Sequence, residues 1–272
     1  MPFYTDPAHF PLSVRTLWGN RPCLSDTVGM SDSAVLLAED MVLKIEALSP
    51  ESENEYRILD WLQGRLPVPE LYARETVDTE SGVLQYLLME RIGGVMACHH
   101  TMMTRPAVVT SLLAEALRRM WELDTTGCPT VHTLDRKLAL AAARVEGGLV
   151  DVEDCNPATF GKGGFRDPAH LLQWLEDNRP PEEPVFSHGD FCLPNLLLEN
   201  DRIRGYIDLG RAGLADRWQD IALCWRSLGS NARGEYGGPG YAGFGDTSLF
   251  DALGLAPDWD MVRYYVLLDE LF

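Results

Sequence analysis

Three residues with oxygen-bearing side chains stand at defined spacing in residues 185–211, VFSHGDFCLPNLLLENDRIRGYIDLGR. Asp190 is followed five residues later by Asn195, and Asp208 comes directly after the last apolar run of the stretch. Carboxylate and amide oxygens are the hard ligands that Mg²⁺ and a phosphate-bearing substrate require. The stretch therefore predicts a magnesium and phosphate site.

Short strands are expected to position these side chains. Polar loops and turns separate three apolar, β-prone runs at 185–186, 196–198 and 203–207. The alternative is a β-hairpin capped by Asp and Asn, and a lone H-G-D would favour that alternative. Asn195, Asp208 and Gly210 all stand at matching offsets, which favours the chemical interpretation.

The order H-G-D-x4-N followed by I-D-x-G resembles the catalytic and metal loops of kinases. With Gly189 after the histidine, the stretch resembles the aminoglycoside phosphotransferase family. The ending YYVLLDELF at 264–272 is most similar to the aminoglycoside 3′-phosphotransferases, the kanamycin and neomycin kinases. With IDLGRAGLADRWQDIALC at 207–224 and PDWD at 257–260, the resemblance covers nearly the whole chain.

This resemblance implies an α+β, two-lobed protein-kinase-like fold. We expect a small N-terminal nucleotide-binding lobe with an antiparallel sheet over 1–92, and a larger, mainly helical catalytic and substrate-binding lobe over 93–272. The apolar patterns predict strands at 34–37, 41–45, 71–75 and 83–89, and helices at 106–123, 134–145 and 257–268. A chain of 272 residues, 46% hydrophobic, suits this size.

The bulk composition limits the partners. A net charge of −18 argues against nucleic acid, which needs a basic footprint. No apolar run is long enough to span a membrane, and six scattered cysteines without a CxxC pair predict reduced packing residues. We expect a cytoplasmic monomer or weak dimer.

The nucleotide side is predicted from residues 29–95. Lys44 lies within an apolar strand, where a lysine needs a partner or a ligand. Glu55 is the candidate partner, whereas a solvated helix face better suits Glu51 and Glu53. The resemblance implies that Lys44 reaches the phosphates of ATP. It also implies further nucleotide contacts by the 29–33 loop, by a side chain beside Lys44 and by the hinge main chain: Met30, Ser31, Val42, Glu90 and Ile92.

The resemblance also assigns the chemistry. Asn195 and Asp208 would hold Mg²⁺, and Asp190 would orient the acceptor hydroxyl or act as its general base. Arg211, three residues beyond Asp208, would steady phosphate or Asp190. The cationic acceptor calls for an acidic site, and the motif match places Arg226 near it. The candidate substrate-binding residues are Glu153, Asp154, Asp190, Arg211, Arg226, Glu270 and Phe272, the last through its carboxylate.

The resulting prediction is ATP-dependent phosphorylation of an aminoglycoside at its 3′-hydroxyl, giving antibiotic resistance. One alternative is a related kinase for another small alcohol, such as a different antibiotic, a sugar or an amino alcohol. Another is a binding module without turnover, which would require loss of Lys44, Asp190, Asn195 or Asp208, and all four are present. Ser230-Asn231 and the glycines of loop 151–166 replace acids of the family, so a narrowed or shifted drug spectrum is expected.

Overall fold

The computed structural model describes residues 5–22, 24–25 and 33–272. The chain forms two compact units, one made of Met1–Met96 and Asn195–Ala212, the other of Ala97–Pro194 and Gly213–Phe272. The division into lobes at residue 92 stays a prediction, and the compact units differ from it in giving 195–212 to the first unit. The predicted α+β class is confirmed, because the first unit carries an antiparallel sheet and the second is mainly helical.

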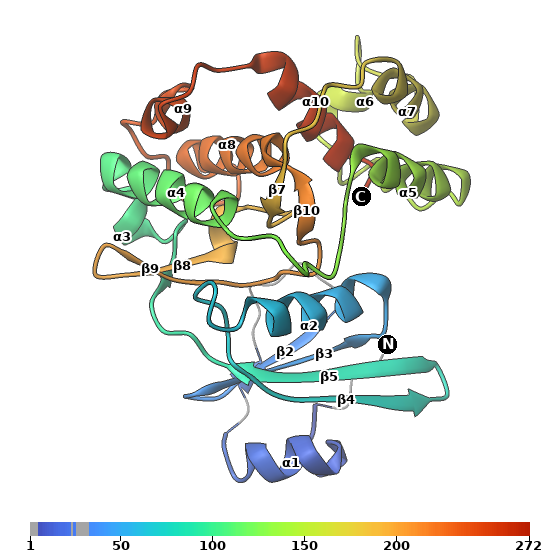
Figure 1. Cartoon of the computed structure of the whole chain (residues 1–272), viewed down its shortest axis with the longest axis vertical. Coiled ribbons are helices and arrows are strands. Elements are labelled where there is room, and N and C mark those ends of the chain that lie inside the picture. The colour runs from blue at the N-terminus through green and yellow to red at the C-terminus, as the bar shows by residue number, and fades with distance from the viewer. Residues whose placement is uncertain (1–4, 23, 26–32) are drawn as a thin grey trace. The chain divides into compact units, whose positions relative to one another are not determined.

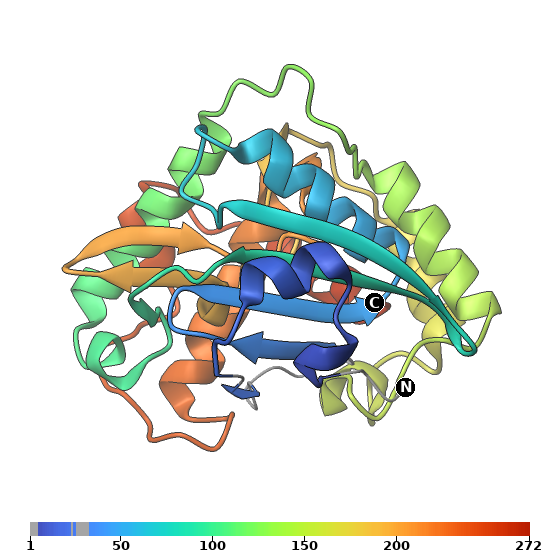
Figure 2. The same cartoon turned by 90° about the horizontal axis from the view of Figure 1, so that it is seen from below.

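The first unit is built on a five-stranded antiparallel sheet. Its strand order is β1 (Leu24–Ser25), β2 (Ala34–Leu37), β3 (Met41–Ala47), β5 (Gly82–Glu90) and β4 (Leu71–Thr79). A short 3₁₀ turn, η1 (Pro7–His9), leads into helix α1 (Leu12–Trp18). Figures 1 and 2 show α1 and α2 (Pro50–Leu62) on opposite faces of the sheet.

Strand β3 has two different faces because side chains alternate along a strand. Leu43 and Ile45 are fully buried and pack in one core with Trp18 of α1. Val42, Lys44 and Glu46 therefore lie on the opposite face of the sheet, the face that α2 covers. Helix α2 begins with a reciprocal capping box between Ser49 and Ser52, which satisfies two otherwise unpaired backbone donors.

A second small sheet in the first unit has the order β6 (Val95–Met96), β8 (Leu196–Glu199) and β9 (Arg202–Tyr206), all antiparallel. Asn200 and Asp201 both have positive φ, 50° and 57°, which is the conformation that a tight two-residue hairpin turn requires. A Cβ at Gly205 would lie 2.3 Å from Ile92 Cδ1, so the end of the Ile92 side chain would have to shift to admit a larger residue.

The second unit consists of helices around a two-stranded sheet. Its elements are α3 (His100–Met103), α4 (Pro106–Trp121), α5 (Leu134–Glu146), α6 (Pro157–Phe160), α7 (Pro168–Asp177), β7 (Pro184–Ser187), a 3₁₀ turn η2 (Leu193–Asn195) that reaches the unit's edge, β10 (Gly213–Asp216), α8 (Arg217–Arg233), α9 (Ser248–Leu253) and α10 (Trp259–Asp269). Strands β7 and β10 pair antiparallel. In the part of the chain that is described, no helix combines the length and apolar character needed to cross a bilayer.

Five helices of this unit pack around one apolar core. Its buried members come from α5, α7, α8, α9 and α10 and include Leu138, Leu171, Ile221, Phe250 and Tyr265. The sequence patterns predicted most of these helices, but α9 and β10 were not predicted. Helix α8 ends at Gly234, whose φ of 72° is typical of a helix C-terminus.

Candidate active site

Lys44 forms an ion pair with Glu55. Its Nζ donates to Glu55 Oε2 at 2.7 Å, and the Glu55 side chain is only 3% exposed. Sequence reasoning predicted this partner, and the structure confirms the pair. Burial alone would lower the pKa of the Lys44 ammonium, but the charges of Glu55, Asp208 and Glu46 outweigh burial and raise that pKa above its usual value. Lys44 is therefore held as a cation.

Two further carboxylates face the same ammonium group. Nζ of Lys44 lies 3.5 Å from Glu46 Oε2 and 3.5 Å from Asp208 Oδ1. Burial raises the pKa of Glu46 to about 7, and Glu46 Oε1 has no hydrogen-bond partner among the described residues. Three carboxylates around one cation leave an excess of negative charge, which favours a second cation at this place.

Asp208 and Asn195 come together in the first unit. The N–H of Ile207 donates to the backbone oxygen of Asn195 at 3.0 Å, which brings the residue before Asp208 next to Asn195. Asp208 has a φ of 60°, uncommon for a residue with a side chain and frequent at functional sites. Its side chain is 55% exposed and so remains accessible to a ligand.

The donor set at this position suits Mg²⁺. Among the described residues, no cluster of three or more His, Cys, Asp or Glu could hold a metal by itself. Mg²⁺ is ordinarily bound by one or two carboxylates together with waters and substrate phosphates. The Asp208 carboxylate and the Asn195 amide fit that description.

Asn54, which sequence reasoning missed, fixes the loop after Asp208. Its Nδ2 donates to the carbonyls of Gly210 at 2.9 Å and Ala212 at 2.8 Å, and the residue is 7% exposed. Asn54 and Glu55 are neighbours on α2, so one turn of helix positions both the lysine and the loop. The sequence signal for Asn54 is a polar residue on the buried face of an amphipathic helix.

Arg211 lies in the same loop, and its Nε is 3.4 Å from Glu51 Oε1 at the surface. The Arg211 side chain is 35% exposed and the Glu51 side chain is 61% exposed, so this ion pair contributes little to stability. The predicted contact of Arg211 with phosphate or with Asp190 stays a prediction.

In the second unit, Asp190 follows a loop that the carboxylate of Asp220 fixes. Asp220 accepts hydrogen bonds at 3.0 Å from Ser187 Oγ and from the N–H groups of His188 and Gly189. Asp220 is completely buried, and burial raises its pKa. Gly189 has a φ of 81°, a conformation that favours glycine. These contacts brace the backbone immediately before Asp190.

A second side chain of α8 holds the same loop. Gln219 Nε2 donates to the carbonyl of Gly189 at 2.6 Å, and its Oε1 accepts from the ammonium of Lys137 on α5. On the other side of Asp190, Ser227 Oγ accepts from the N–H of Leu193 at 3.0 Å. The backbone around Asp190 is thus fixed before and after the carboxylate. Neither Gln219 nor Ser227 was predicted.

The predicted substrate residues of the second unit fall into two groups. Glu153 and Asp154 are exposed in the loop between α5 and α6. Glu270 lies beside that loop, because its Oε2 accepts from the N–H of Asn156 at 2.9 Å. Arg226 Nη2 pairs with Asp269 Oδ2 at 2.5 Å, so its charge is matched within the protein.

Arg144 of α5 joins the end of the chain to the same loop. Its Nε donates to the Leu271 carbonyl at 2.8 Å, and its Nη2 donates to Phe272 O at 2.8 Å and to the Leu149 carbonyl at 2.9 Å. The segment 269–272 and the acidic loop therefore lie together. Sequence reasoning predicted both segments as substrate-binding but missed the arginine between them.

The predicted nucleotide contacts lie on β3 and after β5. Val42 is on the same face of β3 as Lys44 and pairs with Met89. The N–H of Glu90 donates to the Glu70 carbonyl at 2.8 Å, and the adenine contacts predicted for the main chain of Glu90 and Ile92 stay a prediction. Met30 and Ser31 lie outside the described residues.

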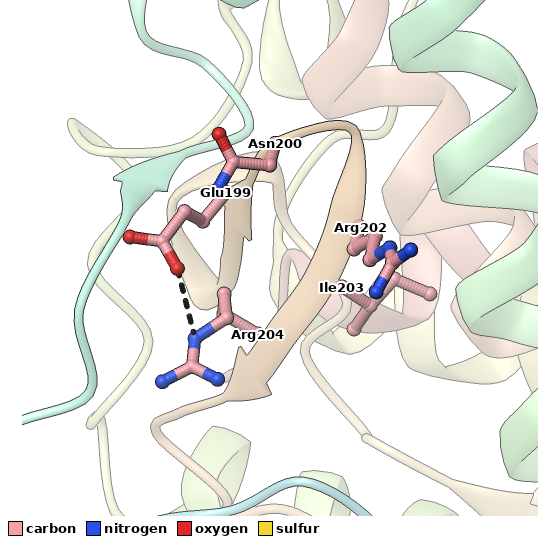
Figure 3. A pocket seen from close by; sticks show the side chains of 5 residues that line it. All are labelled: Glu199, Asn200, Arg202, Ile203 and Arg204. Carbon is pink, nitrogen blue, oxygen red and sulfur yellow. Dashed lines mark ion pairs between the residues drawn. The ribbon is translucent and has the colours of Figure 1, made fainter.

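A shallow pocket on the β8–β9 hairpin contains none of the predicted site residues. Figure 3 shows its lining, with an ion pair of 3.5 Å between Glu199 Oε2 and Arg204 Nε. The lining residues are Glu199, Asn200, Arg202, Ile203 and Arg204. They are turn and edge residues of the hairpin, and they give no reason to move the site from Lys44 and Asp208.

Comparison with known proteins identifies the family. The family model described as the phosphotransferase enzyme family matches residues 26–264. An aminoglycoside 3′-phosphotransferase from Enterococcus faecalis is 36% identical over 260 residues, covering 92% of this chain and 93% of the relative.

Two solved structures also match well. An aminoglycoside-3′-phosphotransferase of type VIII has a TM-score of 0.78 at 28% identity, covering 96% of this chain and 98% of that one. Aminoglycoside phosphotransferase APH(3″)-Id from Streptomyces rimosus, in complex with ADP and streptomycin, has a TM-score of 0.75 at 25% identity, with 95% and 96% covered. The chain therefore belongs to the phosphotransferase enzyme family and, within it, to the aminoglycoside 3′-phosphotransferases.

Proposed function

We propose that this enzyme transfers the γ-phosphoryl group of ATP to the 3′-hydroxyl of an aminoglycoside antibiotic and so confers resistance to it. The observation that carries this proposal is the Lys44 ammonium, held 2.7 Å from the buried Glu55 carboxylate and 3.5 Å from Asp208. Phosphoryl transfer needs mainly positioning and charge neutralisation from the protein, and a fixed lysine beside a metal-binding aspartate supplies both.

Lys44 contacts the phosphates of the nucleotide in this proposal. Val42 packs on the base, the main chain at Glu90 and Ile92 reads the adenine edge, and the loop containing Met30 and Ser31 covers the phosphates. The ADP held by the Streptomyces rimosus relative supports a nucleotide at this position. Asn195 and Asp208 would hold Mg²⁺, which neutralises charge on the phosphate oxygens when it is bound.

Asp190 contacts the acceptor hydroxyl of the drug. Its carboxylate orients the 3′-hydroxyl and accepts its proton as the new bond to phosphorus forms. The loop that carries it is fixed by Asp220 and Gln219, so the carboxylate is positioned before substrate arrives. The ammonium groups of the drug contact the acidic loop and the end of the chain, with Glu153, Asp154 and Glu270 as the carboxylates. Arg226 and the Phe272 carboxylate complete the proposed acceptor site of the second unit, and Arg211 of the first unit is proposed to contact phosphate.

We place the reaction in the cytoplasm, where ATP is available. Five cysteines among the described residues are free thiols, as expected in a reducing compartment.

A direct test incubates the purified enzyme with kanamycin and Mg-ATP and measures the mass of the product by mass spectrometry. We expect a mass increase of one phosphoryl group, NMR assignment of the phosphate to the 3′ position, and loss of the reaction when EDTA removes Mg²⁺. An unchanged drug, with turnover of a different small alcohol, would contradict the proposed substrate.

A further inference from the structure

We propose that Cys192 is a positioning residue of this phosphoryl transfer, because its thiol holds one carboxylate oxygen of Asp190 in a fixed orientation. This inference rests on the proposed function, in which Asp190 receives the acceptor hydroxyl. It gives a role to a cysteine that composition alone assigns to packing.

Two hydrogen bonds join Cys192 to Asp190. The thiol Sγ lies 3.1 Å from Asp190 Oδ1, and the N–H of Cys192 donates to the Asp190 carbonyl at 2.8 Å. The second bond closes a tight turn two residues after the aspartate, and this turn aims the thiol back at the carboxylate. The backbone thus places the sulfur, and the sulfur fixes the carboxylate.

The turn itself has little freedom to move. Phe191 and Leu193, on either side of Cys192, are 1% and 0% exposed. Ser227 Oγ accepts from the N–H of Leu193, which anchors the turn to α8. Because both neighbours are packed, the backbone of the turn is held in place, and the turn keeps the thiol within reach of Asp190.

The thiol is the donor in this contact. Burial raises the pKa of Cys192 well above its usual range, and the negative charge of Asp190 raises it further. At neutral pH the sulfur therefore keeps its proton, and an ionised carboxylate can only accept it.

A neutral donor is suited to this position. A guanidinium bonded to Asp190 would offset its negative charge and make it a weaker proton acceptor. Arg226, whose charge influences Cys192, is instead paired with Asp269 at 2.5 Å. The thiol orients Asp190 Oδ1 without adding charge, so the carboxylate keeps its capacity to accept the proton of the hydroxyl.

The test compares Cys192→Ala with Cys192→Ser, two variants that differ by one oxygen atom. Serine restores a hydrogen-bond donor at the same position, and alanine does not. With kanamycin and Mg-ATP, we expect kcat of Cys192→Ala to fall about five- to tenfold, the size of one weak hydrogen bond, with KM for ATP within about twofold of the wild type. Cys192→Ser should recover most of the lost kcat.

Cys98→Ala is the matched control, because Cys98 is another partly buried thiol of the second unit and is not among the proposed site residues. Its kcat should equal that of the wild type, and thermal unfolding of all variants reports any loss of folding. An unchanged kcat in Cys192→Ala would overturn the inference, and so would an equal loss in both Cys192 variants, which indicates packing alone. Wild-type turnover is measured first, and its absence would reject the proposed function together with the role of Cys192.

Discussion

Lys44 on β3 and Glu55 on α2 form a short, buried ion pair in the first unit, with Nζ and Oε2 2.7 Å apart. A buried charge that loses its partner is strongly destabilising, typically by about 3–5 kcal/mol. The pair therefore fixes the position of α2 as well as the direction of the lysine. Asn54, the neighbour of Glu55, binds the carbonyls after Asp208, so the same helix turn links the lysine to the metal-binding loop.

Glu55→Gln should weaken the use of ATP, because the amide cannot hold the ammonium of Lys44 by charge. We expect kcat/KM for ATP to fall by at least about tenfold and the protein to unfold more easily. Glu53→Gln is the matched control from the same helix, since Glu53 pairs with Arg57 at the surface. Steady-state kinetics and denaturant unfolding check both variants, and equal effects in the two would contradict the role of Glu55.

Asp190→Ala should remove the group that receives the acceptor hydroxyl. We expect kcat to drop by about 10²–10⁴-fold, the range for a positioned acid–base group, with little change in the affinity for ATP. Isothermal titration with a non-hydrolysable nucleotide separates binding from turnover. An undiminished kcat would exclude Asp190 from the mechanism.

Glu46 predicts a pH dependence of stability. Burial raises its pKa to about 7, with Lys44, Glu55 and Asp208 as the charged groups that face it. Between about pH 4.5 and pH 7 the folded protein binds more protons at this group than the unfolded chain does. The contribution of Glu46 to the free energy of unfolding therefore falls as pH rises through this window.

Glu46→Gln carries no titrating group, so its free energy of unfolding should rise relative to wild type, by on the order of 3 kcal/mol between pH 4.5 and pH 8. Urea unfolding at a series of pH values measures this difference. Glu80→Gln, an exposed turn residue, is the control. A constant difference between Glu46→Gln and wild type across the range would show that folding does not shift the pKa of Glu46.

The drug spectrum should be narrower than the presence of the catalytic residues alone suggests. Ser230 and Asn231 stand where relatives were expected to carry acids, and Asn231 Nδ2 donates back to the Ser227 carbonyl of its own helix at 2.8 Å. Fewer carboxylates offer fewer contacts to the ammonium groups of the drug. A panel of 4,6- and 4,5-disubstituted aminoglycosides should show unequal kcat/KM values, and similar efficiency across the panel would contradict this prediction.

Much of the site could be predicted because its residues lie in local patterns. Lys44 interrupts an apolar strand, Glu55 follows a helix start, and Asp208 ends a β-prone run. Asn54 was missed because its hydrogen bond to Gly210 spans 156 residues: its place on the buried face of α2 marks it as a buried polar residue but does not identify its partner. Gln219 was missed for the same reason, since its bond to the Gly189 carbonyl depends on where α8 packs.

Prediction of the fold is limited in the same way, because some elements depend on distant partners. The amphipathic helices were predicted from their period, whereas β10 was missed because Gly213 and Asp216 lower its β-propensity and only its pairing with β7 makes it a strand. Helix α9 has only six residues, too few to show a clear helical period.

The proposed transfer to the 3′-hydroxyl is tested most directly by a coupled ADP-release assay with Mg-ATP, comparing kanamycin with tobramycin, which lacks that hydroxyl. We expect steady ADP release with kanamycin and only the background rate with tobramycin. Equal turnover of the two drugs would place the phosphate on another hydroxyl, and turnover of neither would contradict the proposed substrate.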